Sequence, residues 1–147
     1  MAEATTHIVR ASLARDKAVY RDIEIPGTLS LYDLAEAIVG AFGFDFDHPF
    51  GFYSGLTRGT MMQKQPKYEL FADVGGETDA MSVERTQIAD VFVRPGHKMT
   101  FLFDYGDGWT FMVRFMKAGK TEPGALYPRL VRQAGKAPLQ YPLAEDE

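Results

Sequence analysis

The chain has 147 residues and a formal net charge of −4, and it contains no cysteine. Its length is typical of one domain, so we expect residues 1–147 to form a single domain. The lack of cysteine excludes disulfides, thiolate metal sites and cysteine nucleophiles, and the acidic balance argues against a duplex-DNA binder, which usually carries a basic face.

The ends of the chain and its hydropathy predict a cytoplasmic protein without membrane contact. Residues 1–10 lack the apolar core of a signal peptide. No apolar run approaches the roughly 18 residues that span a bilayer. The last residues, 143–147, are acidic, and we expect them to form a disordered tail.

Two elements are predicted in the first third of the chain. Residues 7–25 favour a hairpin, because apolar side chains alternate along the second half of the segment and a polar tip separates the halves. Residues 31–42 favour an amphipathic helix, because apolar residues recur there at helical spacing. Ser30 with Asp33 forms a capping-box pattern before this helix, and Gly43 stands where the helix should end.

The middle of the chain predicts shorter elements. Residues 44–54 alternate between aromatic and other side chains, which is typical of a strand, and Pro49 favours an edge position or a bulge. The other expected elements are a short strand at 67–72, a polar mobile segment at 73–87, a helical turn at 87–92 and a last strand at 127–132.

The most regular stretch is 99–115, where two aromatic runs flank a turn with two aspartates and the single tryptophan. A three-residue loop at 106–108 would place Phe103 opposite Phe111 and make one face of the hairpin wholly apolar. Such a loop commonly ends in a left-handed residue, for which Gly108 is suited. On this interpretation the glycine and aspartate residues are present because they form the turn, and the tryptophan is present because it packs in the core. The alternative is a functional site at the turn.

The order of these elements predicts the α+β class. We expect a mostly antiparallel sheet with one main amphipathic helix packed on one face. A β-grasp-like mixed sheet is the alternative arrangement.

Two clusters of polar residues are candidates for chemistry or binding. Asp45 and Asp47 share a strand face and could coordinate one cation. His48 would point to the opposite side, which favours a solvated rim over a metal site. Basic residues gather around a Met-Met pair in the loop at 55–66 and just after it, where they could touch a protein partner or nucleic acid. These basic residues are Arg58, Lys64 and Lys67.

Three segments together resemble one known family. They are "VYRDIEIPGTLSLYDLAEAIVGAFGF", "FLFDYGDGW" and "LYPRLV". The chain resembles the Ri-plasmid open-reading-frame-three-like domain family, whose members are also labelled passenger proteins of insertion elements. The resemblance covers residues 7–142. It implies an α+β fold with a sheet and a packed helix, and it leaves the biochemical role undefined.

The departures from the family pattern imply a degenerate polar site. The family's His-x-His-Glu keeps its first histidine, but its last two positions are Phe50 and Gly51 here. The family hairpin ends in Glu-His, where this chain has Thr110 and Phe111, and residues 137–141 replace a Cys-Pro-Pro-Glu-Asp run. We therefore expect Phe50 and Phe111 to lie in contact or to be separated by one side chain. The candidate residues of the degenerate site are Asp45, Asp47, His48, Phe50, Asp104 and Phe111.

Three functional hypotheses follow. The first is a non-enzymatic protein-interaction or regulatory domain without cofactor or metal, acting through loops on a rigid sheet. Its candidate binding residues are Arg58, Lys64, Lys67 and Asp107. The second is a nucleic-acid-associated accessory protein of a plasmid or mobile element, which the family context favours and the net charge opposes. The third is a metal-dependent enzyme with a degenerate site. The sequence identifies neither the partner nor the oligomeric state.

Overall fold

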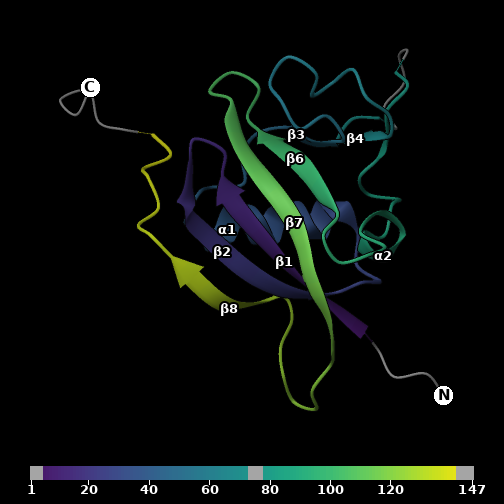
Figure 1. Cartoon of the computed structure of the whole chain (residues 1–147), viewed down its shortest axis with the longest axis vertical. Helices are drawn as coiled ribbons and strands as arrows, with labels where there is room; N and C mark the ends of the chain where they lie inside the picture. The colour runs from purple at the N-terminus through teal and green to yellow at the C-terminus, as the bar shows by residue number, and fades with distance from the viewer. Residues whose placement is uncertain (1–4, 73–77, 142–147) are drawn as a thin grey trace.

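The computed structural model describes residues 5–72 and 78–141, and its strands form one sheet in the order β5-β4-β3-β6-β7-β1-β2-β8 (Figure 1). Neighbouring strands are antiparallel except β4 and β5, which are parallel at one edge. The strands are β1 (Thr5–Leu13), β2 (Asp16–Pro26), β3 (Phe50–Tyr53), β4 (Lys67–Glu69), β5 (Met81–Ser82), β6 (Lys98–Phe103), β7 (Trp109–Lys120) and β8 (Arg129–Ala134). The helices are α1 (Leu31–Ala41) and α2 (Ile88–Val91).

The predicted α+β class with one main helix is wrong, because a mixed eight-stranded sheet dominates the molecule. The two helices have 11 and four residues. Single strands are as long as the longer helix, since β2 has 11 residues and β7 has 12. A β-grasp-like arrangement is also not formed, since the parallel pair among the described strands is the short one at the edge. The helix gave the strongest sequence signal because eleven residues repeat its period, while a strand as short as β5 offers no period to detect.

The first hairpin and the helix are confirmed. β1 pairs with β2 along nearly its whole length. Ser30 and Asp33 exchange both hydrogen bonds of a capping box, and Gly43 follows the C-cap with φ +75°. α1 lies behind the sheet in Figure 1, and it packs its apolar face against the aromatic side chains of the strands.

The predicted strand at 44–54 is shorter than expected, because only Phe50–Tyr53 pairs with neighbouring strands. Asp45 instead hydrogen-bonds through its backbone to the side chain of Gln140, with Asp45 N donating to Oε1 at 2.7 Å. The edge position predicted from Pro49 is also wrong, since β3 lies between β4 and β6.

The hairpin at 99–115 is confirmed, but its register is shifted by two residues. Phe103 lies opposite Trp109, and Phe101 lies opposite Phe111, so the turn has five residues, 104–108, rather than three. A shift of two preserves the side-chain alternation, and the apolar face of the hairpin is therefore as predicted.

The remaining elements match the expectations more loosely. The strands at 67–72 and 127–132 are observed as Lys67–Glu69 and Arg129–Ala134, and the turn at 87–92 is observed as Ile88–Val91. The predicted mobile segment falls partly, and the predicted tail wholly, outside the described residues. Within the described residues, neither helix is long and apolar enough to cross a membrane.

An aromatic cluster fills the space between α1 and the sheet. Phe101 is fully buried at its centre, and its ring centroid lies 5.8 Å from that of Phe50 and 5.7 Å from that of Phe111. Phe50 and Phe111 are thus separated by one side chain, as predicted. Both positions, where the family resemblance places histidines, belong to the hydrophobic core in this chain.

Candidate functional site

The β6–β7 turn is organised by Asp104. Its carboxylate is buried, and Oδ1 accepts hydrogen bonds from the backbone N–H groups of Gly106 and Asp107 at 3.0 and 3.2 Å. Its own N–H donates to the carbonyl of Pro49, and its φ is +67°. Asp104 therefore leaves the extended backbone that would continue the pairing with β7, which explains why the loop is two residues longer than predicted.

Gly108 closes this turn with φ +69°, as the hairpin pattern predicts. We expect Gly108→Val to lower the free energy of unfolding by about 1–3 kcal/mol, because a β-branched residue is strained in the left-handed region. Gly106→Val is the matched control, since a Cβ there meets only Asp104 Oδ1 at 3.4 Å. Chemical denaturation of both variants measures the difference, and equal losses would contradict this account of the turn.

A polar network joins the loop before β3 to the C-terminal segment. We call Asp47, His48, Asp104 and Tyr141 the His48 network. His48 Nδ1 lies 2.7 Å from Asp47 Oδ1, while Nε2 lies 3.6 Å from Asp104 Oδ2. The hydroxyl of Tyr141 donates to Asp47 Oδ2 at 3.0 Å.

The His48 network brings together three residues of the predicted degenerate site. The carboxylates of Asp47 and Asp104 approach different ring nitrogens of His48, which point away from each other, so the three groups do not face one common point. No group of three or more His, Asp or Glu side chains that could hold a metal ion is found within residues 5–72 and 78–141.

The hydrogen bond that His48 donates to the carboxylate of Asp47 raises the pKa of His48, and the charge of Asp104 acts in the same direction. We expect an NMR titration to place this pKa above its usual value of about 6.5. Because the pKa is raised on folding, the stabilisation is fully present below pH 6.5 or so and is lost as the pH rises through the folded pKa. Asp47→Asn should lower the pKa of His48, whereas Asp45→Asn should leave it nearly unchanged.

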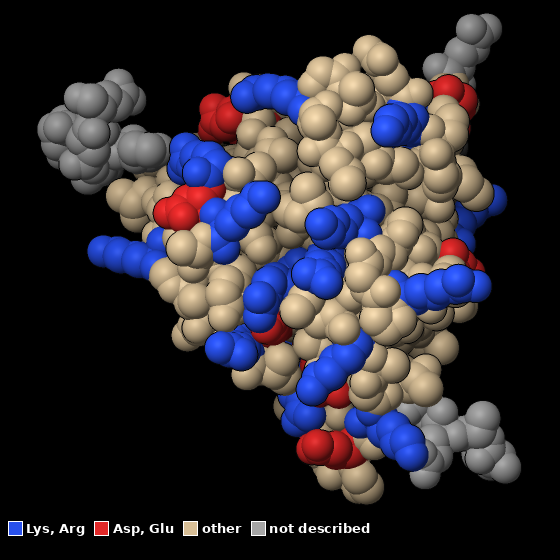
Figure 2. Space-filling view, viewed as in Figure 1, with Lys and Arg blue, Asp and Glu red and all other residues tan. Residues whose placement is uncertain are grey.

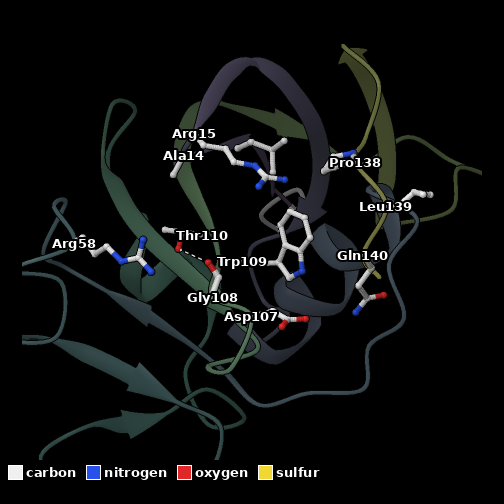
Figure 3. Close-up of a pocket in the computed structure, with 11 residues that line it drawn as sticks. Ala14, Arg15, Arg58, Asp107, Gly108, Trp109, Thr110, Pro138, Leu139 and Gln140 are labelled. Carbon is white, nitrogen blue, oxygen red and sulfur yellow. Dashed lines mark hydrogen bonds between the residues drawn. The ribbon is translucent and has the colours of Figure 1, made fainter. Parts of the chain in front are cut away.

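A groove of about 640 Å³ opens on the other side of the turn (Figure 3). Four segments that are distant in sequence line it: the β1–β2 turn, the loop after β3, the β6–β7 turn and the C-terminal segment. We call it the Trp109 groove. The polar and aromatic side chains that line it are Arg15, Arg58, Asp107, Trp109, Thr110 and Gln140.

Trp109 forms the floor of this groove. Its ring packs on Phe44 with centroids 4.8 Å apart, and the guanidinium of Arg15 lies 4.8 Å from the ring centroid. Its Nε1 is buried and has no hydrogen-bond acceptor in the described part of the chain. In Figure 3 this nitrogen lies on the side of Asp107 and Gln140.

The groove carries a net positive charge, from two guanidinium groups and one carboxylate. Arg58 approaches the turn closely, with Nη2 at 3.6 Å from the position that a Cβ on Gly108 would take. Neither Arg15 nor Arg58 has an ion-pair partner among the described residues. The groove can therefore offer two charged donors to an incoming anion.

Of the four predicted binding residues, the structure places two in the Trp109 groove. Arg58 and Asp107 line it, whereas Lys67 pairs with Asp79 at 3.0 Å and exposed Lys64 lies outside it. Arg15 is not among the predicted residues, because in the sequence the β1–β2 turn shows only a polar tip between two strands. Gln140 and Tyr141 are also not among them, because their positions depend on the path of the chain after β8.

A further polar cluster, in which only Tyr53 is fully buried, lies on the sheet face opposite α1. The hydroxyl of Tyr53 donates to Glu69 Oε2 at 2.6 Å and lies 2.8 Å from the hydroxyl of Tyr105. Burial is the main cause that raises the pKa of Tyr53, followed by the hydrogen bond with Glu69. Because these groups satisfy one another, we assign them a structural role.

Comparisons with known proteins agree with the fold and the family resemblance. The family model described as plasmid pRiA4b ORF-3-like protein matches residues 7–140. The crystal structure of a protein of unknown function, MM3350 from Methanosarcina mazei Go1, is similar with a TM-score of 0.71 and 20% sequence identity, over 92% of this chain and 72% of that chain. At this identity the likeness shows the fold alone. No curated protein matches the chain.

Proposed function

The chain belongs to the plasmid pRiA4b ORF-3-like protein family, and we propose that it is a non-enzymatic binding domain whose Trp109 groove takes an acidic segment of a protein partner. The observation that carries this proposal is that the guanidinium groups of Arg15 and Arg58 reach one groove from two separate loops, and that neither has an ion-pair partner within residues 5–72 and 78–141. A carboxylate placed between them would gain charge-assisted hydrogen bonds.

The surroundings of Arg58 add a second feature of the ligand. A smaller, largely apolar hollow of about 140 Å³ adjoins the groove and is lined by Leu56, Met61 and Met112. Arg58 lines both spaces. A segment with an acidic residue next to an apolar one would fill both, in the way that interfaces combine an apolar anchor with a polar rim.

The groove favours binding over catalysis. Its hydroxyl group, on Thr110, donates to the carbonyl of Gly108 at 3.0 Å, and no histidine is among its described lining residues. A nucleophile needs an adjacent base within hydrogen-bond reach, and Thr110 is directed to a backbone oxygen instead.

Selection from a random peptide library displayed on phage tests this proposal. We expect the protein to enrich peptides with Asp or Glu beside an apolar residue. The double variant Arg15→Gln with Arg58→Gln should bind the enriched peptides at least about tenfold more weakly, because one charge-assisted hydrogen bond contributes about 1.5–3 kcal/mol.

The matched control is Lys17→Gln with Lys64→Gln. It removes the same charge outside the groove, at a position on β2 close to Arg15 and at a position in the loop that carries Arg58. This control should bind the peptides normally. The absence of acidic enrichment, or an equal loss in both double variants, would overturn the proposal.

A further inference from the structure

The face of the sheet that α1 leaves open carries a transverse row of basic residues. Lys98 on β6 lies opposite Arg114 on β7, which lies opposite Arg10 on β1. On the other side, Asp22 on β2 lies opposite both Arg10 and Arg132 on β8. Directly opposed residues point to the same face. We call Lys98, Arg114, Arg10 and Arg132 the basic row.

Burial along β7 shows which face this is. Phe111, Val113 and Phe115 are buried under α1, whereas Arg114 between them is exposed. α1 lies behind the sheet in the view of Figure 1, and Figure 2 shows lysine and arginine side chains in a band across the face turned to the viewer. The band contrasts with the net charge of −4 for the whole chain.

The two acidic residues of β2 beside the row, Asp22 and Glu24, are already paired. Asp22 receives two hydrogen bonds from Arg10, at 2.8 and 3.0 Å, and Glu24 lies 2.8 Å from Arg129 Nη2. Lys98, Arg114 and Arg132 have no ion-pair partner among the described residues. Three positive charges of the row therefore remain uncompensated.

Repulsion between neighbouring cations of the row lowers the stability of the folded protein. Like charges directly opposite each other on a sheet repel, and both Lys98–Arg114 and Arg114–Arg10 are such pairs. A bound polyanion would remove this repulsion along the whole row. Five strands about 4.8 Å apart make the row roughly 19 Å long, which spans about five or six stacked nucleotides at 3.4 Å each.

Arg10 adds a feature suited to unpaired bases. Its guanidinium carbon lies 3.8 Å from the centroid of the Tyr20 ring, and Asp22 holds the group in place from the side. A fixed guanidinium plane is one of the groups on which single-stranded bases stack. Duplex DNA is instead read by a helix or a two-stranded ribbon that enters a groove, and this surface is the broad face of a sheet.

We propose that the basic row binds the backbone of a single-stranded nucleic acid across strands β6, β7, β1, β2 and β8. This site is separate from the Trp109 groove and does not depend on it.

Fluorescence anisotropy with a labelled 15-nucleotide oligo-dT at 50 and 200 mM salt tests the proposal, with oligo-U in parallel to compare DNA with RNA. Three phosphate contacts predict that affinity falls about 20-fold over this fourfold rise in salt, from a slope of about 0.7 per contact. The triple variant Lys98→Gln, Arg114→Gln, Arg132→Gln should bind weakly and lose about two units of that slope.

The matched control is Lys17→Gln, Lys64→Gln, Arg94→Gln, which removes three exposed charges outside the row. It should retain the affinity of the wild type apart from a small general effect of charge. Amide chemical shifts of the wild-type protein give a second readout that needs no variant, and oligo-dT should perturb β7 and β1 but not α1.

Several results would overturn the proposal. These are absence of binding at 50 mM salt, equal losses in the two triple variants, or shift changes confined to residues outside these strands. Equal affinity for a duplex of the same length would refute the preference for single strands. Equal competition by polyglutamate would show a general polyanion surface instead of a nucleic-acid site.

Discussion

Replacing Phe101 with alanine is expected to lower the free energy of unfolding by about 3–5 kcal/mol, which is the usual range for truncating a buried phenylalanine. The Phe101 ring is fully buried and contacts those of Phe50, Phe52, Phe103 and Phe111 at centroid distances of 4.7–6.5 Å. Its removal would leave a cavity between α1 and the centre of the sheet, where neighbouring rings cannot collapse without leaving their own contacts. Urea denaturation followed by circular dichroism measures the loss.

Phe71→Ala is the matched control, because this phenylalanine is 58% exposed. Its truncation should change the free energy of unfolding by less than about 0.5 kcal/mol, as is usual for surface positions. A loss in Phe101→Ala as small as that in Phe71→Ala would mean that the aromatic cluster does not hold the helix against the sheet.

Gly55→Ala is expected to destabilise the protein by about 1–3 kcal/mol and to disturb the Trp109 groove. A Cβ on Gly55 would overlap the backbone carbonyl of Thr60 and lie 2.6 Å from the Cα of Met61. Backbone atoms cannot rotate away, so the loop that follows β3 must move. This loop carries Arg58, and its displacement should weaken the binding of acidic peptides to the groove.

Gly59→Ala is the control in the same loop. A Cβ there meets no atom within 4 Å, and its φ is not in the left-handed region. We expect this variant to be neutral or slightly stabilised, by up to about 1 kcal/mol, because alanine restricts the unfolded chain. If both glycine variants bind peptides as the wild type does, peptide binding to the groove does not depend on the position of Arg58.

The sequence predicted the elements whose signals are local. The helix after Ser30 could be recognised from its periodic apolar residues, its capping box and Gly43, all of which lie within fourteen residues. The same holds for the first hairpin and for the apolar face of the second. In each case the hydrogen bonds that define the element join residues that are close along the chain.

Tertiary contacts decided the details that the sequence interpretation missed. The longer turn starts at Asp104, whose N–H donates to the carbonyl of Pro49, a residue 55 positions earlier in the chain. The strand expected over 44–54 begins only at Phe50 because Gln140, far along the chain, takes the backbone hydrogen bonds of Asp45. Such partners carry no periodic signal that would connect them in sequence.

The sequence by itself determined the family, the helix, the two hairpins and the aromatic character of the core, because periodicity and turn chemistry are encoded in neighbouring residues. Only the tertiary structure decided that Arg15 and Arg58 share a groove with Trp109, and that four cations from four strands align in one row. Net charge is a sum over the whole chain and does not report how the charges are distributed. Strand register fixes that distribution, and here it places basic side chains of an acidic protein side by side on one face of the sheet.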